Sequence, residues 1–599
     1  MAGTWEIERR CNIKNESGNL PFIRFPSIIK TPREKREGEM KYPKLLSALT
    51  ILVVLVAACG PAATPAPATT APVAPPPTSA PPTSAPPTAK PTAVPPTAVP
   101  PTPAPRILKV ALTASVTTWD PSASFSTEAL YMTNLYEPLL WVNPPDAKDK
   151  YTPALAEKWE YSNDGTIWTV HLRKGVKFHD GADLNADAVV KSISRTITLG
   201  GGAAFIWGPV ATMETPDPMT VVFKLKYAAP MELIAGSTYA AWIFSPKAVE
   251  AAAKDDKYFE KGVEAGTGPY KLESYTAGKE VVLTQFGDYW GGWKDKPHFD
   301  KVIVSITPEI VTQQQMLEGG QVDLAGVPLE NIATQFKNNP KFTVFEDPSP
   351  NNYVGFLNTR KPPLDNKLVR QAIAYAIPYD DIVTIGAQGY GTQSRSAVPK
   401  GVWPYSDEVF QYKQDLNKAR DLMKQAGLAG KTIKLTLTYA AENQHEERFA
   451  PVVKDALKQI GIEVEIKPML WAQQWKLAKD DPTKAQDIFL LLYWPTYSDA
   501  GTDNLYSMFH SEKKPFFNLG YYSNPEYDKL IDDAAAIMVT DPKKSQEMYT
   551  QAMNILAQDS PSLFFYDVKN VAVVPKYLQG FKYNLNYPFT TFFYPLSKQ

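Results

Sequence analysis

Histidines and carboxylates are the residues with which this chain would do enzymatic or metal chemistry, and their spacing matches no catalytic pattern. The five histidines are scattered through the 599 residues: His171, His179, His298, His445 and His510. The run His445-Glu446-Glu447-Arg448 comes nearest to a zinc helix, but no second histidine follows four residues on. The sequence also has no nucleophile elbow and no nucleotide-binding glycine motif. We therefore expect no enzyme, no cofactor and no metal, and keep an extracellular hydrolase with dispersed acids as the rival.

Aromatic side chains are the other residues that could recognise a ligand. The chain has 13 Trp and 30 Tyr, and aromatic residues make up 12% of it. Such side chains suit a large core or a binding cleft, and the core is the commoner use. The formal net charge of −1 gives no bulk electrostatic reason to expect a nucleic-acid partner.

The elements that must position these side chains differ between the two halves of the folded region. Near residue 106, "RILKVALTASVTTWDP" predicts a strand, and Asn163-Asp164-Gly165 predicts a hairpin turn between two aromatic-rich strands. Asn185 is a candidate N-cap for a following helix. His179-Asp180-Gly181 is best interpreted as a structural turn. The first half is therefore predicted to be rich in hairpins.

From about residue 365 helices and strands alternate. "EERFAPVVKDALKQIGI" has the pattern of an amphipathic helix, and "EVEIKPML" follows it as a strand. "DIFLLLYW" is a short apolar run typical of a buried strand. This order predicts an α/β lobe with right-handed crossovers. Two lobes of different character without a flexible linker predict a cleft at their junction.

A short apolar segment ends at one of only two cysteines. After Lys41 and Lys44, the run from Leu45 to Ala58 carries no charge. Its roughly 14 residues would form about 21 Å of helix, less than the ~30 Å of a bilayer core, so it fits the apolar region of a signal peptide. Two alanines directly before Cys59 resemble a bacterial lipobox, in which the cysteine is lipidated.

The segments on either side of this signal peptide are not expected to fold. Residues 59–105 are almost wholly Pro, Ala, Thr and Ser, a composition that favours an extended tether. Residues 1–39 are polar and match no signal-peptide pattern. We expect Met40 to be the true start and residues 1–39 to be an upstream annotation artefact; the alternative is a structured N-terminal extension.

Several motifs together resemble the extracellular solute-binding proteins of ABC transporters, in the peptide/nickel-type family 5. They occur in the family's order from residue 106 to 599: "NLYEPLL", "PALAEKWEYSNDGTIWTVHLRKGVKFHDG", "GTGPYKL", "QMLEGGQVDL", "FLNTRKPPLDNKLVRQAIAYAI", "LKQIGIEVEI" and "YYSNPEYDKLIDDA". The resemblance implies an α/β, two-lobed periplasmic-binding-protein-like fold of the large cluster C type, with the ligand between the lobes.

This resemblance also implies a division of the chain. The expected parts are residues 1–39 as the upstream extension, 40–58 as the lipoprotein signal peptide, 59–105 as the tether, 106–357 as lobe I, 358–567 as lobe II and 568–599 as a return to lobe I.

Peptide-binding relatives imply where the ligand would be held. They carry an aspartate three residues after a tryptophan, which pairs with the peptide's ammonium group. Here Trp494 matches the tryptophan, but Tyr497 stands at the aspartate position, and Asp499 or Asp503 is the candidate replacement. Loops that face the cleft in relatives add a final set of candidates: Trp119, Ser126 and Trp403. Nickel is not supported, because no histidine lies near Trp494 in the sequence.

The expected protein is a monomeric receptor, held outside the cell membrane by a lipid on Cys59, that delivers an oligopeptide to ABC permease and ATPase subunits. An oligosaccharide or another neutral solute is the alternative cargo, because Trp494 and Tyr497 suit stacking on a sugar ring.

Overall fold

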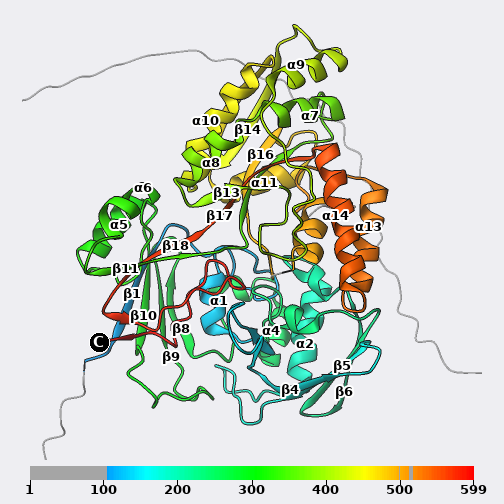
Figure 1. Ribbon diagram of the computed structural model, residues 1–599. Coiled ribbons are helices and arrows are strands. Elements are labelled where there is room, and N and C mark those ends of the chain that lie inside the picture. Colours follow the sequence, from blue (N-terminus) through cyan, green and yellow to red (C-terminus); the bar gives the residue numbers. More distant parts are fainter. Residues whose placement is uncertain (1–103, 498, 512–516) are drawn as a thin grey trace, which may run out of the picture. The chain divides into compact units, whose positions relative to one another are not determined.

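The computed structural model describes residues 104–497, 499–511 and 517–599, which contain helices and several separate sheets (Figure 1). The predicted upstream extension, signal peptide, lipidated Cys59 and nearly all of the tether lie outside these residues. Within the described part, no helix combines the length and apolar character that a bilayer crossing requires.

The first sheet of lobe I has the strand order β1-β10-β9-β8. Its strands are β1 (Ile107–Leu112), β10 (Lys301–Ile306), β9 (Glu280–Gln285) and β8 (Tyr270–Thr276). β1 is the strand predicted near residue 106, and it pairs in parallel with β10. Helix α1 (Ala129–Leu135) is buried along its whole length. The end of β1 and the start of α1 later form one wall of the site.

The second sheet of lobe I has the order β4-β5-β7-β6. It consists of β4 (Ala156–Tyr161), β5 (Ile167–Leu172), β7 (Thr220–Leu225) and β6 (Val210–Asp217). The predicted hairpin turn joins β4 to β5, and Gly165 there has a φ of 69°, which glycine adopts at little cost. Helix α2 (Ala186–Leu199) begins at Asn185, whose side chain accepts a hydrogen bond from Ala188 N, so the N-cap prediction is confirmed.

Shorter elements complete lobe I. They are β2 (Leu140–Val142), β3 (Tyr151–Pro153), η1 (Ala204–Trp207), α3 (Met231–Ala235), α4 (Pro246–Lys254), η2 (Phe259–Lys261), α5 (Ile310–Glu318), α6 (Leu329–Asn331) and η3 (Ile332–Phe336). The motif histidine His179 is buried and ion-paired with Glu264, 2.6 Å away, which agrees with its structural interpretation.

Lobe II is built on a mixed sheet of order β13-β17-β12-β16-β14-β15. Its strands are β13 (Gly391–Gln393), β17 (Ser562–Val568), β12 (Asn352–Leu357), β16 (Ile488–Tyr493), β14 (Ile433–Ala440) and β15 (Ile462–Met469). β14 is parallel to β15 and β16, as the alternating pattern predicted. β12 lies in this sheet, although the expected lobe boundary at residue 357 assigned it to lobe I.

Helices pack on this sheet and beside it. They are α7 (Lys367–Ala376), α8 (Tyr379–Ala387), α9 (Leu416–Gln425), α10 (Gln444–Lys458), α11 (Trp471–Asp480), η4 (Gly501–Leu505), α12 (Tyr506–Phe509), α13 (Pro525–Ile537) and α14 (Pro542–Asp559). α10 is the predicted amphipathic helix, and it connects the parallel strands β14 and β15.

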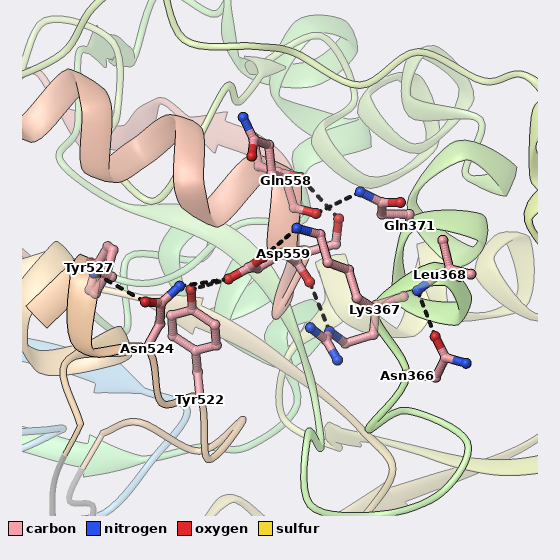
Figure 2. A network of polar contacts seen from close by, with 12 residues as sticks. Asn366, Lys367, Leu368, Gln371, Tyr522, Asn524, Tyr527, Gln558 and Asp559 are labelled. Carbon is pink, nitrogen blue, oxygen red and sulfur yellow. Dashed lines mark hydrogen bonds and ion pairs between the residues drawn. The ribbon is translucent and has the colours of Figure 1, made fainter. Parts of the chain in front are cut away.

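A polar network joins three of these elements around Asp559 at the end of α14 (Figure 2). Its carboxylate pairs with Lys367 of α7 at 2.8 Å and accepts hydrogen bonds from Tyr522 Oη at 2.6 Å and Asn524 Nδ2 at 3.0 Å. The buried Arg370 donates to the Asp559 backbone carbonyl at 2.9 Å. These partners hold the pKa of Asp559 below its usual range despite its partial burial. The network therefore fixes α7 against α14.

The chain crosses between the lobes on two paired segments. β11 (Phe342–Asp347) precedes the entry into lobe II, and β18 (Asn570–Pro575) follows the exit. They pair antiparallel over their full lengths. The chain then continues to β19 (Leu578–Gln579) and β20 (Ser597–Lys598). The C-terminal segment between these two short strands contacts the site from the lobe I side.

Candidate functional site

A cavity of about 430 Å³ lies between the two lobes. Lobe I contributes the end of β1 and the residues around the start of α1. Lobe II contributes Ala440, residues 442–446, Trp471 and the end of β16, and Phe589 comes from the C-terminal segment. The lining is mainly apolar, and its volume falls in the range of about 300–1,000 Å³ that is typical of small-molecule sites.

The lobe I wall is shaped by Glu128, the residue before α1. Its buried carboxylate accepts hydrogen bonds from Ser126 N at 2.8 Å, from Phe125 N at 2.5 Å and from the Thr117 hydroxyl. Burial raises the pKa of Glu128. Ser126 lines the cavity, and the carboxylate holds its backbone in place. Glu128 therefore acts as a positioning residue behind this wall.

The lobe II wall is held by the N-terminus of α10. Asn443 is its N-cap and accepts from the backbone N–H groups of His445 and Glu446. The Glu446 carboxylate accepts from Ala440 N at the end of β14, Leu492 N in β16 and Asn443 Nδ2, each at 3.0 Å. Burial raises the pKa of Glu446 to about 8. This one side chain therefore ties two strands to the helix at the cavity.

His445 lies on the same wall as a neutral aromatic group. Its ring stacks on Tyr353 at 4.9 Å, and Nδ1 is hydrogen-bonded to Tyr566 Oη at 2.9 Å. Burial lowers the pKa of His445 to about 4, and the nearby Arg448 guanidinium adds to this shift. At neutral pH the ring is therefore uncharged and suited to stacking or to a neutral hydrogen bond.

Trp494 closes the cavity across the interface between the lobes. Its Nε1 donates to Phe125 O of lobe I at 2.9 Å. Its ring lies 5.8 Å from Trp471 and 5.8 Å from Phe589. Because the indole N–H is used between the lobes, the ring itself is what Trp494 offers to a ligand.

Two further contacts bring the lobes together beside the cavity. Arg448 of α10 pairs with Glu330 of α6. Thr238 N donates to Thr496 O at 3.1 Å.

The sequence candidates divide into residues that line the cavity and residues that do not. Trp494 and Ser126 line it together. Tyr497 is buried in a hydrophobic cluster of lobe I, and its hydroxyl bonds to Thr502 at 2.6 Å. Trp119 lies in the lobe I core, and Trp403 packs on Tyr549 in lobe II. The lining residues of the cavity include none of these last three side chains.

The two candidate aspartates bond within their own loop. Asp499 accepts from Gly501 N at 3.0 Å, from Thr502 N at 3.3 Å and from Thr502 Oγ1 at 2.7 Å. Asp503 accepts from Tyr493 Oη at 2.7 Å and from Thr496 N. Both are buried, which raises the pKa of each to about 6, and neither lines the cavity. Their geometry is that of a loop-stabilising pair.

The structure adds cavity residues that sequence reasoning did not select: His445, Trp471 and Phe589. His445 stands 49 positions before Trp494 in the sequence, yet both side chains line the same cavity. The statement that no histidine lies near Trp494 is therefore true along the sequence but not in space. The Asn443 N-cap signal could have identified His445, because it places residue 445 in the first turn of α10, immediately after a strand. Phe589 carries no local signal of this kind.

Glu442 contributes a carboxylate to this lining, and the described lining residues include no Lys or Arg. Glu446 is largely protonated at neutral pH, because burial raises its pKa to about 8. Glu442 also accepts from Trp471 N, the first residue of α11, at 3.1 Å. The cavity therefore suits a neutral or positively charged group better than an anion. In the described residues there is no cluster of three or more His, Cys, Asp or Glu side chains arranged to hold a metal.

Comparisons with known proteins agree with this architecture. A probable D,D-dipeptide-binding periplasmic protein, DdpA, of Escherichia coli K12 is 30% identical over 434 residues, which cover 72% of this chain and 82% of the relative. The dipeptide-binding protein of the same organism is 29% identical and covers 72% and 83%.

Solved structures confirm the expected two-lobed α/β fold. The Helicobacter pylori periplasmic binding protein DppA, in complex with the peptide STSA, superposes with a TM-score of 0.73 at 24% identity, covering 82% of this chain and 98% of that one. Bacillus subtilis AppA, in complex with a nonapeptide, gives 0.72 at 24% identity and covers 83% and 100%.

The family model matches residues 150–516, which is more than half of the chain. The motifs, the fold and this match lead to one conclusion: the chain belongs to the bacterial extracellular solute-binding proteins of family 5.

Proposed function

We propose that this protein is the extracytoplasmic receptor of an ABC importer and that it binds an oligopeptide in the cavity between the lobes. The observation that carries the proposal is the cavity itself, whose walls come from both lobes. A ligand there touches both lobes, so its binding favours the closed form that a permease would recognise. The named relatives bind peptides, which supports peptides as the ligand class.

The charges of the cavity support an orientation for the peptide. A peptide ammonium that becomes buried in the cavity needs a carboxylate as its partner, and the exposed Glu442 lies on the lining. Tyr497 and Asp499 use their polar atoms in their own loop. We therefore place the ammonium near Glu442 and the apolar side chains against Trp494 and Trp471.

A neutral solute such as an oligosaccharide is the second candidate. The cavity is lined by the adjacent aromatic rings of Trp494 and Phe589, and it has no Lys or Arg among its described lining residues to receive a peptide carboxylate. Aromatic faces stack on sugar rings.

The part of the chain before the lobes supports an anchored receptor. A lipid on Cys59 and a tether over residues 59–105 would keep the binding lobes beside the membrane and its permease. We further propose that the protein acts without chemical change of its ligand.

Native mass spectrometry of the purified protein tests the ligand class. We expect a co-purified peptide, and titration calorimetry with short peptides and with maltooligosaccharides then separates the two candidates. Trp494→Ala should weaken binding about tenfold or more. Trp403→Ala is the matched control outside the cavity and should leave Kd unchanged. Hydrolysis of the ligand during incubation, or equal effects of both substitutions, would contradict the proposal.

A further inference from the structure

A second cavity, of about 260 Å³, lies next to the first on the lobe I side. Its walls are the end of β1, strand β18 and the C-terminal segment. The two cavities have four lining residues in common: Leu112, Thr113, Leu130 and Phe589. The two cavities are therefore adjacent, and these four side chains lie at their boundary.

Phe589 differs from the other three shared residues. Leu112, Thr113 and Leu130 belong to the sheet edge and to α1, whereas Phe589 projects from the C-terminal segment and is 50% exposed. Its ring stands nearly perpendicular to Trp494, at 85° and 5.8 Å. Because Phe589 is half-exposed and touches Trp494, its ring is placed to limit the length of a ligand rather than to fill the core.

The backbone at Phe589 is held in an unfavourable conformation. Its φ is 60°, in the left-handed region that a non-glycine residue seldom adopts. Neighbouring contacts maintain it: Thr590 Oγ1 donates to Tyr587 O at 2.8 Å, and Asn134 Nδ2 donates to Thr591 O at 2.9 Å. Residues kept in such regions by their surroundings concentrate at ligand sites.

The two cavities also differ in charge. The first has the Glu442 carboxylate, while the described lining of the second has no charged side chain. Its polar groups are neutral and include Gln313, Asn570 and Tyr583. A ligand that extended into it would place an uncharged, partly apolar group there, because an unpaired charge would be desolvated without a partner.

We propose that Phe589 is a specificity-determining residue that separates the two cavities and confines the ligand to the first. Without its ring the cavities join, and the protein accepts ligands lengthened by an uncharged group. This inference rests on the proposed receptor function and goes further by naming the residue that sets ligand length.

The test compares wild type, Phe589→Ala and Phe592→Ala. Phe592 belongs to the same segment but packs on Trp141 and Tyr587 and lines neither cavity, so it is the matched control. Calorimetry uses alanine peptides of two to six residues, as free acids and as C-terminal amides, and maltooligosaccharides of matching lengths. We expect Phe589→Ala to gain about tenfold in affinity for the longer amides, with a smaller gain for the free acids. Unchanged length preference would overturn the inference.

A crystal structure of Phe589→Ala without ligand gives a second, independent result. One continuous cavity supports the inference, and collapse of Trp494 into the vacated space overturns it. Phe589→Gly serves if the alanine variant folds poorly, because glycine adopts the φ of this position without strain. If no probe binds to any variant, the peptide and sugar proposals fail, and the crystal structure alone then decides whether Phe589 separates the cavities.

Discussion

Replacing Asp499 by alanine should destabilise the protein and leave ligand binding intact. Its carboxylate is buried and accepts hydrogen bonds from Gly501 N, Thr502 N and Thr502 Oγ1, at 3.0, 3.3 and 2.7 Å. The hydroxyl can turn to another acceptor, but the two backbone N–H groups cannot. Alanine therefore leaves two backbone donors without their acceptor.

The size of the effect follows from these two donors. Each buried group left unsatisfied costs about 1–3 kcal/mol, so the free energy of unfolding should fall by about 2–6 kcal/mol. At about 2.1 cal/mol/K per residue, residues 106–599 have an unfolding entropy near 1 kcal/mol/K, so Tm should fall by about 2–6 °C. Asp499→Asn keeps an amide oxygen for the two donors and should lower Tm by only about 1 °C.

Differential scanning fluorimetry measures the stability, and calorimetry with the co-purified ligand measures the affinity of the same samples. We expect Kd to change by less than about threefold, because Asp499 does not line the cavity and sites without shared contacts couple by only about 0.3–0.5 kcal/mol. An alanine variant with the wild-type Tm but no binding would show that the carboxylate contacts the ligand, and would refute this assignment.

Asp559→Ala should lower the free energy of unfolding by about 2–4 kcal/mol, because it removes an ion pair and two hydrogen bonds to a half-buried carboxylate; Lys529→Ala, on the exposed side of α13, should cost at most about 0.5 kcal/mol in the same denaturation experiment. Burial raises the pKa of Asp567 to about 6 from an ordinary 3.8, so the folded state holds more protons than the unfolded state between these values, and stability falls as pH rises through this window. Asp567→Asn should therefore flatten the pH dependence of the free energy of unfolding between pH 4 and 6, by up to about 3 kcal/mol in denaturant titrations; an unchanged profile would contradict the raised pKa. Cys59→Ala should abolish incorporation of labelled palmitate and release the protein from membranes; continued labelling would place the lipid elsewhere.

Much of the fold was predictable because its signals are local. The hairpin turn at 163–165 and the N-cap Asn185 act through residues within a few positions of one another, and both were found in the structure. The alternation of helices and strands predicted the parallel pairing of β14 with its neighbours. The mixed sheet was not predictable in this way, since β12 and β17 pair across 206 to 215 residues of chain.

The sequence by itself determined the family, the two-lobed fold and two of the cavity residues, Trp494 and Ser126. Motifs that occur in a fixed order along the chain identify the family, and this needs no information about distances in the folded protein. Only the tertiary structure decided the rest of the site. Asp499 is turned into its own loop by hydrogen bonds that spacing does not reveal, and His445 and Phe589 reach the cavity from segments 144 residues apart. Long-range packing sets these positions, and it is the sum of many contacts rather than a property of any one stretch.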